Sequence, residues 1–123
     1  MSFSSQNKLK SKADIDLVFS KGAFLKVSGF SLVYRELDPK GSSGFRVGFS
    51  IGKKTQPRAV DRNKTKRIMR ESFRLFFPKT FSPSSVNYDF MIVCNEKTVP
   101  SFALVSDKIK SLLLSFAEIV KNG

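Results

Sequence analysis

The chain of 123 residues carries 22 Lys and Arg against 10 Asp and Glu, a net charge of +12, and 41% of its residues are hydrophobic. This length predicts a single domain, residues 1–123, with one core, and the apolar content excludes a disordered basic tail. The chain has no His and only one Cys, Cys94, which removes the commonest general base, an internal disulfide and a Cys-based zinc site.

The compartment and the kind of partner follow from the same features. Met1–Lys12 is polar and lacks the apolar core of a signal peptide, and no run of about 18 apolar residues could cross a membrane. A lone cysteine fits a reducing compartment, so we expect a cytoplasmic protein. The net charge of +12 indicates a polyanionic partner, either nucleic acid or an anionic membrane surface.

The first part of the chain predicts one helix and two strands. Residues 1–11 are expected to form a flexible basic lead-in, and a short helix over Lys12–Lys21 ends at Gly22. The aromatic and branched residues of Phe30–Leu37 predict a strand. Phe45–Gly52 alternates apolar with polar or small residues, which predicts a half-buried strand that forms a hairpin with the one before it.

The second part predicts a helix, a strand and a helix. A helix over Asp61–Phe77 is expected to stop at Pro78, and the short apolar run Tyr88–Cys94 predicts a buried strand. A final helix begins after Pro100. Its apolar residues recur every three or four positions and form one stripe: Phe102, Val105, Ile109, Leu112, Leu113, Phe116, Ile119 and Val120. We expect one sheet packed against helices on one of its faces.

The positive charge is concentrated in the window Lys53–Arg74. Its 22 residues include nine basic and two acidic ones, an excess of seven charges. At about 100° per residue, Asn63, Arg67, Arg70 and Arg74 lie within about 60° of one another on the predicted helix. The opposite side of that helix carries apolar and small residues: Thr65, Ile68, Met69, Ser72, Leu75 and Phe76.

This pattern predicts a helix that buries one side and presents cations on the other, although Phe73 falls near the border of the basic side. Like charges four residues apart on a helix repel each other, and a row of phosphates would neutralise them and release counterions. A solvated basic face and a membrane-surface helix are the other interpretations. The membrane helix needs bulky apolar residues beside exposed cations, so the pattern favours nucleic acid.

An ordered motif in this window resembles the signature of the bacterial ribonuclease P protein subunit. The motif comprises Lys53–Lys54, Ala59–Arg67, Arg70–Glu71 and Phe73–Arg74. Similar residues extend over nearly the whole chain: Leu9, Asp14, Val18, Phe19 and Gly22 in and next to the first helix, Arg46–Ser50, and Tyr88–Asp89. The chain departs from the family pattern at three places, with Lys64 for an arginine, Ile15 for an aromatic residue, and a spacer Thr55–Arg58 that is one residue longer.

The resemblance implies both the fold and the activity. The expected fold is a single α+β domain in which a four-stranded mixed sheet packs with three helices, in the order α-β-β-β-α-β-α, with a left-handed β-α-β crossover. The expected partners are a large catalytic RNA and precursor tRNA, with no membrane and no small-molecule substrate. The RNA, with Mg²⁺ that it mainly holds itself, would cut off the 5′ leader of the precursor tRNA.

Two sets of site residues are implied by position in the family motif. The set facing the catalytic RNA is Lys53, Lys54, Arg58, Arg62, Asn63, Lys64, Lys66, Arg67, Arg70 and Arg74. The set in a cleft for the single-stranded leader, between the first helix and the sheet, is Ile15, Phe19, Val33 and Arg35. Phe19 has a second interpretation as a simple core residue.

A nuclease acting without RNA is the enzymatic alternative. It requires clustered carboxylates for metal ions, or a base beside a nucleophile. Asp14 and Asp16 point apart on a helix, Asp61 fits the start of the basic helix, and Cys94 fits a small buried residue. We therefore expect no catalytic residue and no metal ligand in the protein. The non-enzymatic alternative is a generic structured-RNA-binding or ribosome-associated basic protein.

Overall fold

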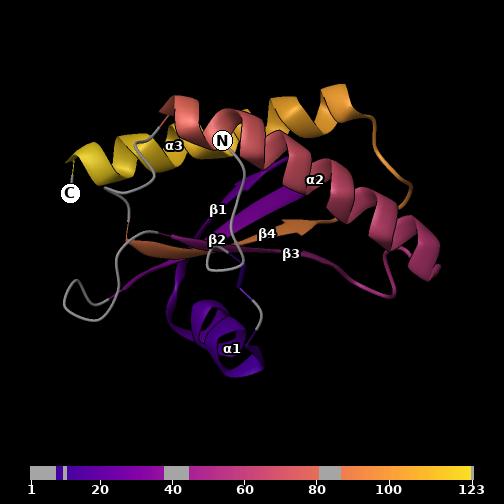
Figure 1. Ribbon diagram of the computed structural model, residues 1–123, viewed down its shortest axis with the longest axis horizontal. Coiled ribbons are helices and arrows are strands. Elements are labelled where there is room, and N and C mark those ends of the chain that lie inside the picture. The colour runs from indigo at the N-terminus through magenta and orange to yellow at the C-terminus, as the bar shows by residue number, and fades with distance from the viewer. Residues whose placement is uncertain (1–7, 10, 38–44, 81–86, 123) are drawn as a thin grey trace.

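A computed structural model describes residues 8–9, 11–37, 45–80 and 87–122 of the chain (Figure 1). The predicted loops around residues 38–44 and Pro83 lie outside these described residues. The secondary structure follows the order expected from the family resemblance: α1 (Lys12–Lys21), β1 (Ala23–Val27), β2 (Phe30–Glu36), β3 (Arg46–Ile51), α2 (Ala59–Thr80), β4 (Tyr88–Cys94) and α3 (Phe102–Asn122).

The four strands form one mixed sheet in the order β1-β2-β4-β3. The pairs β1–β2 and β2–β4 are antiparallel, while β3 and β4 are parallel neighbours joined through α2. The predicted hairpin between β2 and β3 is therefore wrong. β4 lies between them because its residues are buried on both faces of the sheet, which is typical of a central strand.

The helices lie on both faces of the sheet, so the prediction of helices on one face is also wrong. α2 and α3 lie side by side on one face, and α1 lies alone on the other (Figure 1). The reason is visible along β2. Leu32 faces the core beneath α2 and α3, whereas Val33 belongs to a smaller cluster beneath α1, which also contains Leu9, Val18 and Met91.

Strand β1 is an element that the residue pattern did not locate. It forms a hairpin with β2 through Ser28 and Gly29, and Gly29 has a positive φ of 82° that favours glycine. A Ser-Gly pair between two apolar runs is the sequence signal that could have identified it. Just before β1, a Cβ on Gly22 would lie 2.4 Å from the Val18 carbonyl oxygen, so only glycine allows so close a passage from α1 into β1.

The main core is aromatic and lies between the sheet and the helices α2 and α3. The rings of Phe73 and Phe77 stack with their centroids 4.8 Å apart. The ring centroids of Phe45 and Phe77 are 4.4 Å apart. Phe116 of α3 meets Phe90 of β4 edge-on at 5.0 Å. This packing orients α2 and therefore decides which of its residues face solvent.

Helix α2 differs from its prediction at its ends and on its faces. It begins at Ala59 and continues through Pro78 to Thr80, because the buried Phe77 keeps the last turn packed on the core although proline removes one backbone hydrogen bond. Phe73, expected near the basic border, is fully buried among the core aromatic rings, whereas Leu75, expected in the core, is exposed.

The first helix is capped at its N-terminus, and the segment before it pairs with β3. Ser11 caps its N-terminus by accepting a hydrogen bond from the backbone N–H of Asp14 at 3.4 Å. The predicted lead-in, residues 1–11, lies mostly outside the described residues. Its described residue Leu9 is buried, and the Leu9 N–H donates to the Val47 carbonyl oxygen at 3.0 Å, so this part of the chain covers the outer edge of β3.

Candidate nucleic-acid interface

The residues predicted to face RNA lie in the turn after β3 and along the outer side of α2. Seven of them are exposed: Lys53, Lys54, Arg58, Asn63, Lys64, Arg67 and Arg70. The remaining three, Arg62, Lys66 and Arg74, are half-buried. The opposite side of the helix, with Met69 and Phe73, is fully buried. The amphipathic arrangement predicted from the sequence is therefore present, and none of the ten side chains lies in the core.

The spacer Thr55–Arg58 is anchored by the buried side chain of Gln56. Its Nε2 donates to the carbonyl oxygens of Glu96 and Thr98 at 2.9 and 3.2 Å, and its Oε1 accepts from the Thr65 hydroxyl at 3.0 Å. These bonds tie the turn after β3 both to the loop after β4 and to α2. The turn that carries the lysine pair is thereby held at the start of the basic helix.

Two of the predicted arginines already have partners within the chain. Arg62 donates from Nη1 to the carbonyl oxygens of Gln56 and Pro57 at 2.9 and 2.8 Å, so it helps to close the spacer. Arg74 pairs with Glu71 of the preceding turn, and the hydrogen bond between them lowers the pKa of Glu71. These two residues are the least available of the set to an external anion.

The other cations of the set form no ion pair with any described residue: Lys53, Lys54, Arg58, Lys64, Lys66, Arg67 and Arg70. Asp61 lies in the first turn of α2, where its negative charge interacts favourably with the helix dipole. Since described neighbours leave the repulsion among the cations uncompensated, an external polyanion would relieve it.

The four residues predicted to contact the leader lie on the α1 side of the sheet but differ in exposure. Phe19 is 44% exposed, which rules out the interpretation as a simple core residue. Val33 is buried, while Ile15 and Arg35 are half-buried. Ile15 packs against the small cluster beneath α1. Phe19 is therefore the member of this set with the most surface available to a ligand.

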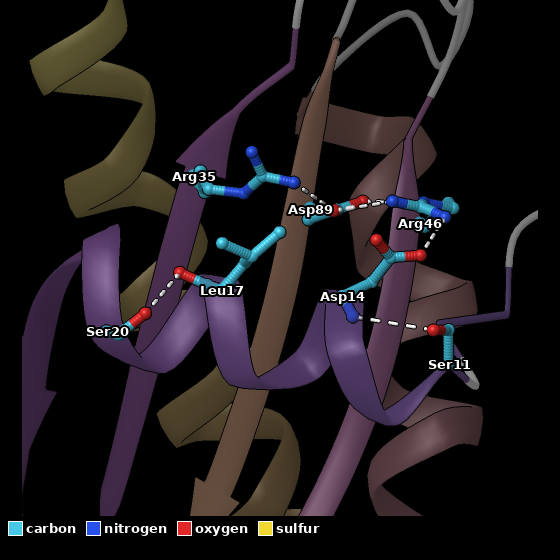
Figure 2. A network of polar contacts seen from close by, with 7 residues as sticks. All are labelled: Ser11, Asp14, Leu17, Ser20, Arg35, Arg46 and Asp89. Carbon is cyan, nitrogen blue, oxygen red and sulfur yellow. Dashed lines mark hydrogen bonds and ion pairs between the residues drawn. The ribbon is translucent and has the colours of Figure 1, made fainter.

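A row of charged side chains crosses three strands on the same side of the sheet, and sequence reasoning missed it (Figure 2). Asp89 of β4 is directly paired with Arg35 of β2 and with Arg46 of β3. Its carboxylate is 0% exposed. Arg46 holds it with two hydrogen bonds of 2.7 Å, from Nε and Nη2, and Arg35 Nη2 lies 3.5 Å away.

The same arginine connects the sheet to α1. The third nitrogen of Arg46, Nη1, donates to Asp14 of α1 at 3.0 Å, and each of these two side chains is 32% exposed. Figure 2 shows α1 running across the strands beside the row, with Asp14 reaching Arg46. The hydrogen bonds to Asp89 and then to Asp14 raise the pKa of Arg46, so the guanidinium remains charged. Arg46 thus fixes the helix that carries Phe19.

The described residues contain few other groups that could serve as a functional site. Among them, no three His, Cys, Asp or Glu side chains gather as a metal-ion site, and no described helix is both long and apolar enough to cross a membrane. Cys94 is a buried free thiol whose Sγ accepts from the Glu96 N–H at 3.4 Å, and burial raises its pKa. Cys94 is the small buried residue that the sequence predicts.

The fold and the basic helix together define a class, a small α+β protein that presents a row of cations from the helix between two parallel strands. Comparisons with known proteins agree on one family. The family model described as Ribonuclease P matches residues 3–117. The chain therefore belongs to the ribonuclease P protein family, the protein components of a tRNA-processing ribonucleoprotein endonuclease.

Individual relatives and solved structures support this membership. The ribonuclease P protein component of Chlorobaculum tepidum is 42% identical over 69 residues, which cover 54% of this chain and 45% of that protein. The one from Histophilus somni is 33% identical over 93 residues, covering 76% of this chain and 71% of that protein. The chain thus spans about half the length of the first relative and nearly three quarters of the second.

The fold itself matches solved structures. The Staphylococcus aureus RNase P protein superposes with a TM-score of 0.74 at 22% identity, covering 89% of this chain and 94% of that one. The Thermotoga maritima protein superposes with a TM-score of 0.70 at 26% identity, covering 86% and 94%.

Proposed function

We propose that this chain binds a catalytic ribonuclease P RNA and the 5′ leader of precursor tRNA, and so assists the RNA in removing that leader. Family membership supports the proposal, and one observation carries it. The cations of the ordered motif lie on the outer side of a helix whose inner side is buried, and most of them have no anionic partner among the described residues.

The chemistry of cleavage belongs to the RNA in this proposal. Mg²⁺ would be held mainly by the RNA and would supply the charge stabilisation needed for phosphodiester hydrolysis. The protein contributes cations, and Arg in particular suits phosphate because its planar guanidinium can donate two parallel hydrogen bonds. We place the complex in the cytoplasm, which the free thiol of Cys94 fits.

A reconstitution experiment tests the proposed function. Purified protein, a bacterial ribonuclease P RNA, and the two combined are each incubated with precursor tRNA at low Mg²⁺. We expect the combination to release the leader faster than RNA alone, and the protein alone to release none. Cleavage by RNA-free protein would support the nuclease alternative. RNA binding without faster cleavage would support a generic RNA-binding protein.

The leader contact makes a separate prediction for Phe19. The Phe19→Ala variant should weaken binding of precursor tRNA to the reconstituted complex by about 5- to 100-fold, because loss of one aromatic stacking contact removes about 1–3 kcal/mol. Binding of mature tRNA, which has no leader, should not change. Both affinities are measured by titration of labelled tRNA, and an equal loss for the two substrates would remove the leader role.

A further inference from the structure

The edge strand β1 presents an aromatic side chain and a lysine on the α1 side of the sheet. Leu25 and Val27 of this strand pack against the main core, so the alternating residues Phe24 and Lys26 point to the opposite side. Phe24 is directly paired with Val33 of β2, which lies in the cluster beneath α1. Phe24 and Lys26 therefore continue the face that carries the predicted leader residues.

Helix α1 does not cover this end of the sheet. Its main contacts are with β2 and β4, and Phe24 is 59% exposed, the largest exposed fraction among the large hydrophobic side chains that the structure describes. The ammonium of Lys26 lies 5.5 Å from the centre of the Phe24 ring. An exposed aromatic ring with a cation beside it is the pairing that proteins use to stack a base and hold its phosphate.

The charges around Phe24 select an anionic occupant. β1 contains no acidic residue, and along β2 the residues on this side are Ser31, Val33 and Arg35, also without an acid. Lys21, exposed in the last turn of α1, adds another cation just before β1. Proteins that bind single strands without reading their sequence combine such basic residues with aromatic platforms. A protein partner would gain less from this excess of positive charge.

We infer that Phe24 and Lys26 form a stacking platform for one nucleotide of single-stranded RNA, beyond the nucleotides that reach Phe19. The inference rests on the proposed function, because the single strand it places there is the leader of precursor tRNA. Phe24 would stack on a base, and Lys26 would neutralise an adjacent phosphate. The platform lengthens the stretch of leader that this chain can hold and makes its affinity depend on leader length.

The test compares two precursor tRNAs that differ only in leader length. One has a single-nucleotide leader and the other a leader of about ten nucleotides, within the usual site size of single-strand-binding domains. Each is titrated with the complex of ribonuclease P RNA and either wild-type or Phe24→Ala protein. We expect Phe24→Ala to weaken binding of the long-leader substrate by about 5- to 100-fold. Binding of the short-leader substrate should stay unchanged.

Two control variants separate stacking from other effects. Phe24→Trp keeps an aromatic face and should retain wild-type affinity for the long leader. Leu114→Ala shortens an exposed side chain on α3, at the opposite face of the sheet, and should leave both affinities unchanged. Thermal unfolding of each variant shows whether the fold is kept.

The possible failures are distinguishable. If the wild-type protein does not accelerate cleavage, the proposed function fails. If the wild type accelerates cleavage and binds the long leader more tightly, but Phe24→Ala behaves in the same way, only the platform is overturned. A Phe24→Ala protein that loses both substrates equally would also overturn it, because the effect would then not depend on the leader.

Discussion

Replacing Arg46 with Ala should lower the free energy of unfolding by about 3 kcal/mol, the low end of the range for breaking a buried ion pair. The reason is the carboxylate of Asp89, which is 0% exposed and would lose both of its 2.7 Å hydrogen bonds. Arg35 would remain 3.5 Å away and would compensate part of the charge. Denaturant unfolding of the isolated protein measures this difference as a shift of the midpoint.

Two milder variants are matched to this one. Arg46→Lys keeps the positive charge but cannot make the paired hydrogen bonds, so its loss should be intermediate. Asp14→Asn removes the charge of a bridge whose two side chains are each 32% exposed, and it should cost at most about 1 kcal/mol. If Arg46→Ala costs no more than Asp14→Asn, the buried carboxylate does not depend on Arg46 in the way that the geometry implies.

The triple variant Lys64→Ala, Arg67→Ala and Arg70→Ala should bind ribonuclease P RNA about 100- to 1,000-fold more weakly, at roughly 1 kcal/mol or more for each charged hydrogen bond lost. All three residues are exposed, and alanine suits a helix, so the fold should be kept. The log–log slope of affinity against salt should also fall by about 2–3, one counterion term for each phosphate contact. Binding titrations at several salt concentrations measure both quantities.

A control with the same loss of charge decides whether position or net charge matters. Lys12 and Lys110 are exposed, Lys108 is half-buried, and none of the three forms an ion pair with described residues. They lie on α1 and α3 and not on the basic side of α2. Their triple alanine variant should bind RNA within about threefold of wild type, because it leaves the cations of α2 in place and salt screens long-range attraction by net charge. Equal losses for the two triple variants would indicate attraction by overall charge and not an interface on α2.

Local signals in the sequence were sufficient for several elements. The bounds of α1 and β4 agree with their predictions, because Gly22 ends the helix and a compact apolar run forms the strand. The cations of α2 could be placed on one side because they belong to one helix, where spacing alone determines the face. The count of four strands came from the family resemblance, since the residues of β1 do not alternate clearly.

Non-local pairings were not accessible in the same way. The position of β4 between β2 and β3 depends on contacts between residues far apart in the chain, and a tight hairpin was the simpler expectation. The charged row could not be predicted for the same reason. Asp14, Arg46 and Asp89 come from three elements, and no spacing in the sequence links them. The side of α2 that holds Phe73 was likewise decided by the aromatic rings that meet there.

The place of β4 also has a consequence for biosynthesis. β4, the strand that lies between β2 and β3, is encoded after α2, so β2 and β3 have no shared neighbour until Tyr88–Cys94 has left the ribosome. Until then the nascent chain can form the β1–β2 hairpin and isolated helices, but not the sheet on which α2 rests. Long-range pairing of this kind slows folding. The basic helix is therefore made before the surface that orients it.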